Sequence, residues 1–429
     1  MRDVVELLIS LTALTALTLC FRQNLRSRTS GDGLAVVGVF CVVLGGFLYN
    51  FGNAPKGQAL QLVLVAILAA LVLLQVHKNS RESSGHGGPK IRLAVYASPI
   101  LAVVLFLVNA TMNPGLPFVE SMGRLLSVLY LVLIVTFCIV SRLTISQAAH
   151  AITLGVLSVL VLAPLGGDAW RACDQFKCGP FGAIYTGPFA SENGLAIIVA
   201  VGILSLMGSW RGRSSWFVLL PFLLTIFATE SRTSQLALGA ALSLWGWLLL
   251  RRGSKAVGRK SPLAVWTVAI GGLFATGLFL VYTSSPSAFS NRGNIWLRGT
   301  GALGDNWVLG LGLERWTYLQ NIGYMPGLFP HSQYLLVLFS GGALGIFVLF
   351  ILFAAPMHSS FTVRREQRYL VSYVIFLCVL GLTEVFWNPI AIDGQTFIVI
   401  PLIVGALQRS SRDARDAAVQ GPARLLGRG

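Results

Sequence analysis

His331 is the residue of this chain best placed to act as a base. It ends a long polar segment, residues 284–331, and stands directly before an apolar stretch. A neutral imidazole between a polar loop and a membrane helix can accept a proton from an incoming hydroxyl group. A histidine in this position can also cap the helix or contact lipid headgroups, so the sequence alone leaves both roles open.

Two arginines are candidates for binding an anion. Arg232 stands in S-R-T, separated from the preceding apolar stretch by Glu230 and Ser231, and Arg292 lies in N-R-G-N-I-W within the long segment. A guanidinium at a membrane boundary needs a partner, which can be Glu230, the lipid headgroups or a bound anion. Because a guanidinium binds phosphate oxygens in a bidentate way, these arginines would suit a lipid-linked phosphate or diphosphate.

The scaffold that must position these residues is a membrane protein. Of the 429 residues, 55% are hydrophobic and 11% are charged, whereas soluble domains carry about 25% charged residues. Apolar runs of about 17 to 25 residues can cross a bilayer, where they must form helices. We predict an all-α fold, a polytopic membrane helix bundle forming a single integral membrane domain over residues 1–429. It has thirteen spans, or twelve if the first run does not cross: 4–21, 34–51, 58–76, 93–110, 122–141, 148–165, 193–208, 214–229, 233–250, 263–283, 332–355, 369–386 and 394–408.

The loops between these spans divide by charge into two families. Seven loops hold 23 of the 32 lysines and arginines: 22–33, 77–92, 141–147, 209–213, 251–262, 356–368 and 409–429. Cytoplasmic loops are enriched in these residues, so we expect this family to be cytoplasmic and the tail 409–429 to be disordered there. The net charge of +16 is spread over short loops, which does not favour binding of nucleic acid.

The same topology sorts the candidate bases. His331 faces outward, whereas the other four histidines lie on the cytoplasmic side: His77, His86, His150 and His358. The alternative external bases are the carboxylates Glu192, Glu230, Asp305, Glu314, Glu384 and Asp393. Glu384, near the outer end of its span, could instead pair with an arginine. We find no Walker, Rossmann or zinc motif, so no metal and no other cofactor is expected.

Two external segments, 166–191 and 284–331, are too long to be simple connections and are expected to be functional. Cys173 and Cys178 share the first segment, either as a disulfide that would hold it in an oxidising compartment or as two free thiols. The second segment suits a short helix at the membrane interface, with its tryptophans at headgroup depth: Trp296, Trp307 and Trp316.

Four motifs occur in order along the chain: G-P-F-A-S-E-N-G-L-A (187–196), S-R-T-S-Q-L-A-L (231–238), N-R-G-N-I-W (291–296) and H-S-Q-Y-L-L-V-L-F-S-G-G-A-L-G (331–345). Together with the long external segment before the histidine, they resemble the O-antigen ligase and O-antigen polymerase superfamily over roughly residues 180–355. The chain departs from the family pattern at Ser332, where asparagine is common.

The resemblance implies a membrane glycosyltransferase of the C-type architecture in the cell (inner or plasma) membrane. Its donor would be a glycan on a polyprenyl diphosphate such as undecaprenyl diphosphate, and its acceptor a glycan or lipid-glycan on the external or periplasmic face. By position in the motifs, His331 would deprotonate or orient the acceptor hydroxyl. Arg232 and Arg292 would hold the donor diphosphate and stabilise its charge as it leaves. Transfer would need no metal and would invert the anomeric configuration.

Two other classes of protein remain as alternatives. A flippase or other transporter of polyprenyl-linked glycans would place charged or broken helices near the bilayer midplane and show internal repeats. A polymerase of the peptidoglycan type would use a carboxylate as its base.

Overall fold

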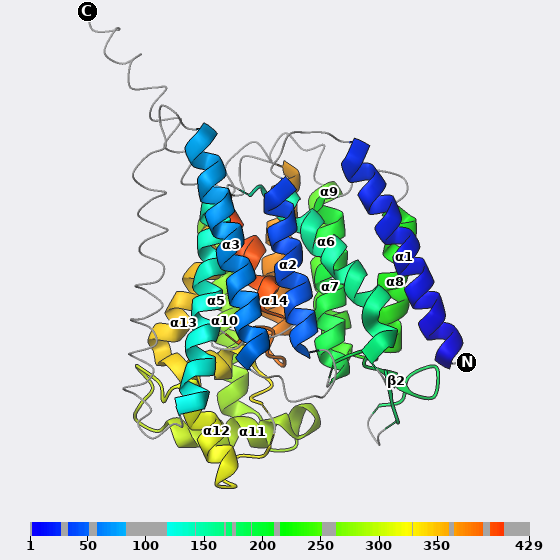
Figure 1. Ribbon diagram of the computed structural model, residues 1–429. Coiled ribbons are helices and arrows are strands. Elements are labelled where there is room, and N and C mark those ends of the chain that lie inside the picture. Colours follow the sequence, from blue (N-terminus) through cyan, green and yellow to red (C-terminus); the bar gives the residue numbers. More distant parts are fainter. Residues whose placement is uncertain are drawn as a thin grey trace, which may run out of the picture.

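The computed structural model describes residues 2–26, 33–50, 58–82, 118–141, 143–166, 169–173, 177–189, 191–209, 215–250, 263–327, 329–359, 364–388 and 395–406. These residues are almost entirely helical (Figure 1). The α-helices are α1 (Arg2–Arg26), α2 (Gly33–Asn50), α3 (Gln58–Glu82), α5 (Phe118–Val140), α6 (Ile145–Leu162), α7 (Glu192–Ser209), α8 (Ser215–Ala228), α9 (Arg232–Leu250), α10 (Leu263–Thr283), α11 (Ala288–Leu303), α12 (Leu313–Asn321), α13 (Gln333–Ser359) and α14 (Arg364–Leu380). Two short 3-10 helices, η1 (Ala163–Gly166) and η4 (Thr396–Val399), accompany the strands β1 (Trp170–Arg171) and β2 (Ile184–Tyr185).

The prediction of an all-α membrane bundle is confirmed. Twelve of the thirteen predicted spans coincide with helices in the described residues, whereas the span 93–110 and the tail 409–429 lie outside them. Within those residues, seven helices are long and apolar enough to cross a membrane: α1, α3, α6, α7, α9, α10 and α13. The remaining predicted spans fall on shorter apolar helices and on α14. The predicted first span is thus a helix of the bundle.

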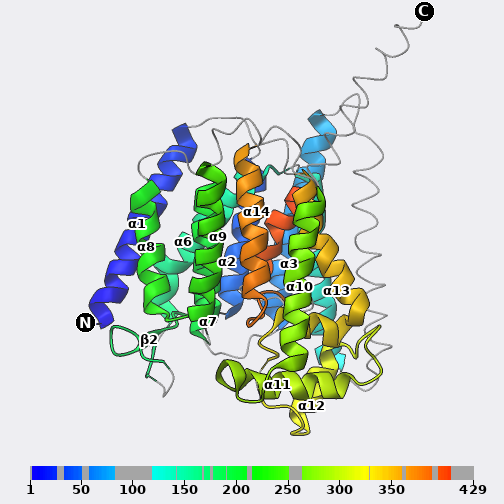
Figure 2. The same ribbon diagram turned by 180° about the vertical axis from the view of Figure 1, so that it is seen from behind.

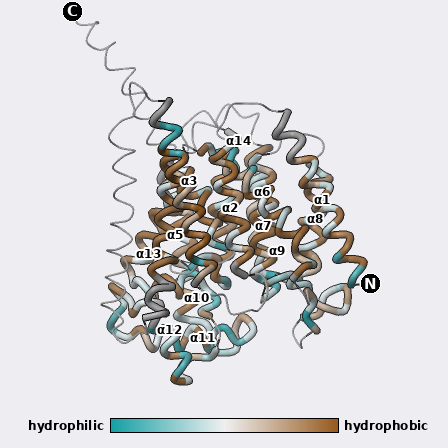
Figure 3. Tube along the Cα trace, viewed as in Figure 1, coloured by the Kyte–Doolittle hydropathy of each residue, from teal (hydrophilic) through white to brown (hydrophobic). Residues whose placement is uncertain are grey.

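We call one end of the bundle the loop end. It carries α11, α12, the β1–β2 hairpin and the first residues of α1 (Figure 1). The view from behind again shows α11 and α12 across the end of α10 and α13 (Figure 2). Hydrophobic residues dominate the long helices, and hydrophilic ones collect at this end (Figure 3). Both long segments that the sequence marked as functional therefore lie at the same end of the bundle.

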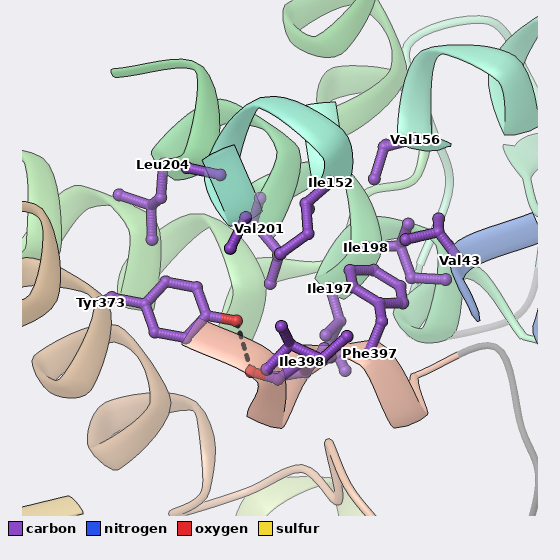
Figure 4. Packing of buried hydrophobic residues seen from close by; sticks show 14 of the residues in the cluster. Val43, Ile152, Val156, Ile197, Ile198, Val201, Leu204, Tyr373, Phe397 and Ile398 are labelled. Atoms are coloured by element: carbon purple, nitrogen blue, oxygen red, sulfur yellow. Dashed lines mark hydrogen bonds between the residues drawn. The ribbon is translucent and has the colours of Figure 1, made fainter. Parts of the chain in front are cut away.

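The main core forms around α6 and α7, which are apolar on nearly every side and bury most of their residues. Such helices belong in the interior of a bundle. Ile152 of α6 and Val201 of α7 pack together with Phe397 of η4 (Figure 4). The hydroxyl of Tyr373 on α14 donates to the carbonyl of Ile398 at 2.7 Å, so a polar group in this core has its partner within the protein.

A second, smaller core lies at the loop end, between α10, α11, α12 and the first turns of α13. It is built from Val281, Ile295, Trp296, Trp316, Leu319, Met325, Leu335 and Phe339. The predicted short helix is present as α11, but the interpretation of its tryptophans as interfacial anchors is wrong for Trp296 and Trp316. Both are buried, because they pack in this small core, whereas Trp307 is exposed.

The helix α13 is broken near its outer third. Gly342 has φ 60°, and the loop between α11 and α12 passes so close that a Cβ on Gly342 would lie 2.2 Å from the Val308 carbonyl oxygen. The amide of Ala343 donates to Trp307 at 2.8 Å, and Leu311 donates to Phe339 at 2.7 Å. Small residues in membrane helices often let a neighbouring helix approach closely. At Gly342 the close neighbour is a loop, and its hydrogen bonds connect the small core to α13.

The segment before α7 forms a small hairpin. Its strands pair antiparallel, Trp170 with Tyr185 and Arg171 with Ile184. Of the two alternatives left open by the sequence, the structure has the disulfide between Cys173 and Cys178. The indole of Trp170 donates to Glu6 of α1 at 3.1 Å, which connects the hairpin to the first helix.

Candidate functional site

Glu384 is the centre of a polar cluster at the loop end. Its side chain is 6% exposed, and it accepts a hydrogen bond from Nη2 of Arg292 at 2.7 Å and one from Nδ2 of Asn193 at 3.0 Å. Its second oxygen, Oε2, lies 3.8 Å from Nδ1 of His331. A buried carboxylate needs such donors, because leaving water is costly for a charge. One carboxylate thus joins three segments of the chain.

Glu384 reaches this position because α14 ends earlier than the sequence predicted. The predicted span ran to residue 386, but α14 stops at Leu380 and the following residues are not helical. The carbonyl of Gly381 accepts from the amide of Gln333 at 2.9 Å, and the Gln333 side chain accepts from the amides of Phe386 and Trp387, each at 3.1 Å. These bonds satisfy an unwound backbone inside the protein, where water is scarce.

His331 is held from both sides along the chain. The buried indole of Trp296 donates to the carbonyl of Pro330 at 2.9 Å. On the other side, the Ser332 hydroxyl accepts from the amide of Leu335 at 3.4 Å and so caps α13, which begins at Gln333. Ser332, the residue at which the chain departs from the family pattern, therefore caps α13. No hydrogen bond from its side chain to the imidazole of His331 is described.

The backbone of His331 lies in the left-handed region, with a φ of 50°. Non-glycine residues avoid this left-handed region unless the surrounding structure imposes it. Five described non-glycine residues have positive φ, and each is a predicted site residue or lies within three positions of one: Glu230, Phe289, Ser290, Asn291 and His331. Strained backbone therefore accompanies all three predicted site residues.

Arg292 follows three of these left-handed residues, which break α11 near its start. Nη1 donates to the carbonyl of Thr383 and Nη2 to Glu384. The guanidinium is 16% exposed and His331 is 27% exposed, so both reach the surface of the cluster. The structure thus brings together two of the three predicted site residues.

Arg232 begins α9 and is exposed. Its neighbour Thr233 lies with its Oγ1 3.2 Å from Oγ1 of Thr383, the residue that accepts from Arg292. The first turn of α9 therefore borders the cluster. The structure places Arg232 at its edge and does not join it to His331 or Glu384 by a described hydrogen bond.

The sequence missed two members of the cluster. Asn193 stood in one of the motifs that carry the resemblance but was given no role, and Thr383 had no signal at all. Glu384 was named as an alternative base or an arginine partner, and it is a partner of Arg292.

A comparison with family models finds a match for one segment of the chain. Residues 217–350, about a third of the chain, match the model described as O-antigen ligase. This segment of the chain is therefore similar to the O-antigen ligase family. None of the curated proteins compared with the chain matches it.

The O-antigen ligase segment contains Arg232, Arg292 and His331, whereas Asn193 and Glu384 lie outside it. The match confirms the resemblance for the three motifs that lie within residues 217–350, and the site combines this matched segment with residues on α7 and after α14. Among the described residues, no three metal-ligating side chains come together. Metal independence of transfer stays a prediction.

Proposed function

We propose that this protein transfers a glycan from a polyprenyl diphosphate to an acceptor hydroxyl at the loop end, on the external face of the cell membrane. The observation that supports this most strongly is the contact of Glu384 with both Arg292 and His331. An anion-binding group and a proton acceptor thus lie next to each other, as displacement of a diphosphate by a hydroxyl requires.

Arg292 and Arg232 bind the diphosphate in this proposal. Arg292 uses two of its five N–H groups on Thr383 and Glu384, which leaves others for phosphate oxygens. Arg232, exposed at the start of α9, lies beside the same segment. As the bond between the anomeric carbon and the diphosphate oxygen breaks, the two guanidinium groups stabilise the charge on the leaving group.

His331 receives the proton. With Nδ1 facing Glu384, Nε2 is the ring nitrogen offered to an acceptor hydroxyl. The acceptor oxygen attacks the anomeric carbon, its proton moves to Nε2, and the electron pair of the broken bond leaves with the diphosphate. One displacement of this kind inverts the configuration. Glu384 orients the imidazole and stabilises its protonated form.

The face of the membrane is inferred from charge. The basic loops belong to the end opposite α11 and α12 in the predicted topology, and such loops stay in the cytoplasm. A cysteine at the exposed position Asp305, introduced as Asp305→Cys, should react with a membrane-impermeant maleimide in intact cells. Reaction only after the cells are opened would place the site in the cytoplasm and contradict the proposal.

The function itself is tested with purified protein in liposomes, supplied with a labelled polyprenyl diphosphate-linked glycan and an acceptor glycan. Release of polyprenyl diphosphate together with a new glycosidic bond, in the presence of a chelator and without a nucleotide sugar, is the expected result. Movement of intact donor across the bilayer without bond cleavage would instead identify a flippase.

A further inference from the structure

We propose that Glu192 is a positioning residue for the transfer reaction, and that the disulfide loop, residues 169–189, holds it in place. The inference rests on the proposed function, because the group positioned is the Glu384 cluster. Glu192 is the first residue of α7 and stands directly before Asn193, which donates to Glu384. A Glu192 side chain that is held in place therefore also holds Asn193, which donates a hydrogen bond to Glu384.

Glu192 is bound by two cations of the disulfide loop. Nζ of Lys177 donates to Oε1 at 2.8 Å, and Nη1 of Arg171 lies 3.3 Å from Oε2. No hydrogen bond to Oε2 is present among the described residues, so the Arg171 contact is electrostatic. The Glu192 side chain is 5% exposed, against 23% for Lys177 and 44% for Arg171. The carboxylate is therefore buried beneath two partly solvated cations.

The positions of the two cations depend on the disulfide. Arg171 lies two residues before Cys173, and Lys177 immediately precedes Cys178. The bond between the two cysteines therefore closes a short ring that contains Lys177, and Arg171 lies just before this ring. Without it, two flexible side chains would have to be ordered on one carboxylate by a loop with many more conformations.

The base of the disulfide loop is already rigid. The amides of Thr186 and Gly187 both donate to the carbonyl of Ala169, at 2.9 and 3.1 Å. The ring of Trp170 packs on that of Tyr185, with 4.9 Å between centroids. The loop is thus anchored where it leaves and rejoins the bundle, and the disulfide orders the part that carries Lys177.

The contacts form one continuous path to the reacting groups. It runs from the disulfide through Lys177 to Glu192, then along the backbone to Asn193 and through its amide to Glu384. Glu384 is the residue that faces His331. A displacement of Asn193 would loosen Glu384 and so misplace the imidazole, and misplacement by about 1 Å can cost a hundredfold in rate.

Substitution of Glu192 should leave the protein folded. Glu192→Gln removes the buried charge while keeping the shape, and the two cations left behind can be hydrated because they are partly exposed. Lys177→Ala is the harsher change, since it leaves the buried carboxylate with a single cation, Arg171, that makes no hydrogen bond to it. Lys177→Arg restores a donor and serves as the conservative variant.

The experiment measures kcat and the KM for the polyprenyl diphosphate-linked donor in liposomes. Glu192→Gln and Lys177→Ala should each lower kcat about tenfold, since the displacement is smaller than a full loss of the contact. The donor KM should stay within about twofold, because Arg232 and Arg292 are unchanged, and Lys177→Arg should recover most of the rate. Asp305→Asn, a carboxylate at the same end and outside the cluster, is the matched control and should behave as the wild type.

Reduction provides a second, independent readout. Dithiothreitol gives the disulfide two electrons and two protons, forming two thiols and its own cyclic disulfide. Treatment should lower the kcat of the wild type to that of the double variant Cys173→Ser/Cys178→Ser. It should leave the double variant unchanged, which excludes an effect on other thiols.

The outcomes separate this inference from the proposed function. Loss of transfer in His331→Ala together with wild-type kcat in Glu192→Gln would overturn only the role of Glu192. Equal rates for Lys177→Arg and Lys177→Ala would also overturn it, because the ion pair would then be irrelevant. Absence of transfer by the wild type would overturn the proposed function itself, whereas undiminished transfer in His331→Ala would overturn only the role of His331.

Discussion

The core around α6 and α7 and the cluster around Glu384 are parts of the same bundle, yet they satisfy their polar groups in different ways. In the core, regular helices satisfy nearly all backbone groups, and a residue such as Tyr373 adds one hydrogen bond to a nearby carbonyl. At the cluster, helices end or break, and charged side chains satisfy one another. The five left-handed non-glycine residues described in the chain all lie near the predicted site residues and none lies in this core.

This difference in backbone geometry shows that the strained residues are concentrated at the cluster. Strained backbone costs about 1 to 3 kcal/mol per residue and persists only where its surroundings enforce it. Here the strained backbone near His331 is held by the small core of Trp296 and Trp316 and by the backbone hydrogen bonds at Gly381. We expect changes at the cluster to alter transfer strongly and changes in the core to alter stability alone.

The loss of Glu384 should lower transfer strongly, because Glu384 contacts both Arg292 and His331. Glu384→Ala leaves the mostly buried Arg292 without its carboxylate and His331 without an orienting group. Transfer should fall about a hundredfold, and the free energy of unfolding by about 3 kcal/mol. Transfer rates and thermal unfolding in detergent measure both. Wild-type transfer in this variant would remove Glu384 from the site.

The arginines should act on donor binding. Arg292→Ala and Arg232→Ala should each raise the dissociation constant of a labelled polyprenyl diphosphate about tenfold, the usual range for a lost charge-assisted hydrogen bond. Arg292→Lys should recover little, because an ammonium cannot bind in the bidentate way. Arg298→Ala, on the exposed side of α11, is the matched control. Unchanged affinity in both site variants would refute the phosphate role.

A substitution at Trp296 tests whether its hydrogen bond helps to hold the backbone next to His331, and a smaller effect is expected. Trp296→Phe keeps a buried ring but removes the hydrogen bond to the carbonyl of Pro330, next to His331. The rate of transfer should fall about fivefold, as expected for about 1 kcal/mol. Trp316→Phe, in the same small core, leaves that bond in place and should retain the wild-type rate. Equal effects of the two variants would mean that core packing, and not the hydrogen bond, matters.

A substitution at Tyr373 tests the core around α6 and α7. Tyr373→Phe leaves the carbonyl of Ile398 without its donor, and the free energy of unfolding should fall by about 1 kcal/mol. The transfer rate per folded molecule should not change. A loss of rate at unchanged stability would show that the core and the cluster are coupled, contrary to the account.

The sequence could predict the scaffold because hydropathy is a local property. Each apolar run identifies its own helix, and the described helices agree closely with the predicted spans. The ends of helices were less predictable. The helix α14 stops at Leu380, and the carbonyl of the next residue, Gly381, accepts a hydrogen bond from Gln333 of α13, which is far away in the sequence.

The site was predicted in part, for a similar reason. His331, Arg232 and Arg292 stand in recognisable motifs at membrane boundaries. The role of Glu384 depends on Asn193, 191 residues away in the chain, and on Arg292, 92 residues away. Contacts of this length leave no periodic or compositional signal, so the carboxylate could be named as a candidate but its partners could not be assigned.

The most direct test of the account is His331→Ala, with donor binding and glycan transfer measured on the same liposomes. The arginines are intact in this variant, so the affinity for a labelled polyprenyl diphosphate-linked glycan should stay within about twofold. Transfer should fall about a thousandfold, within the range for the loss of a general base. Transfer at the wild-type rate would contradict the assignment of His331 as the group that takes the acceptor proton.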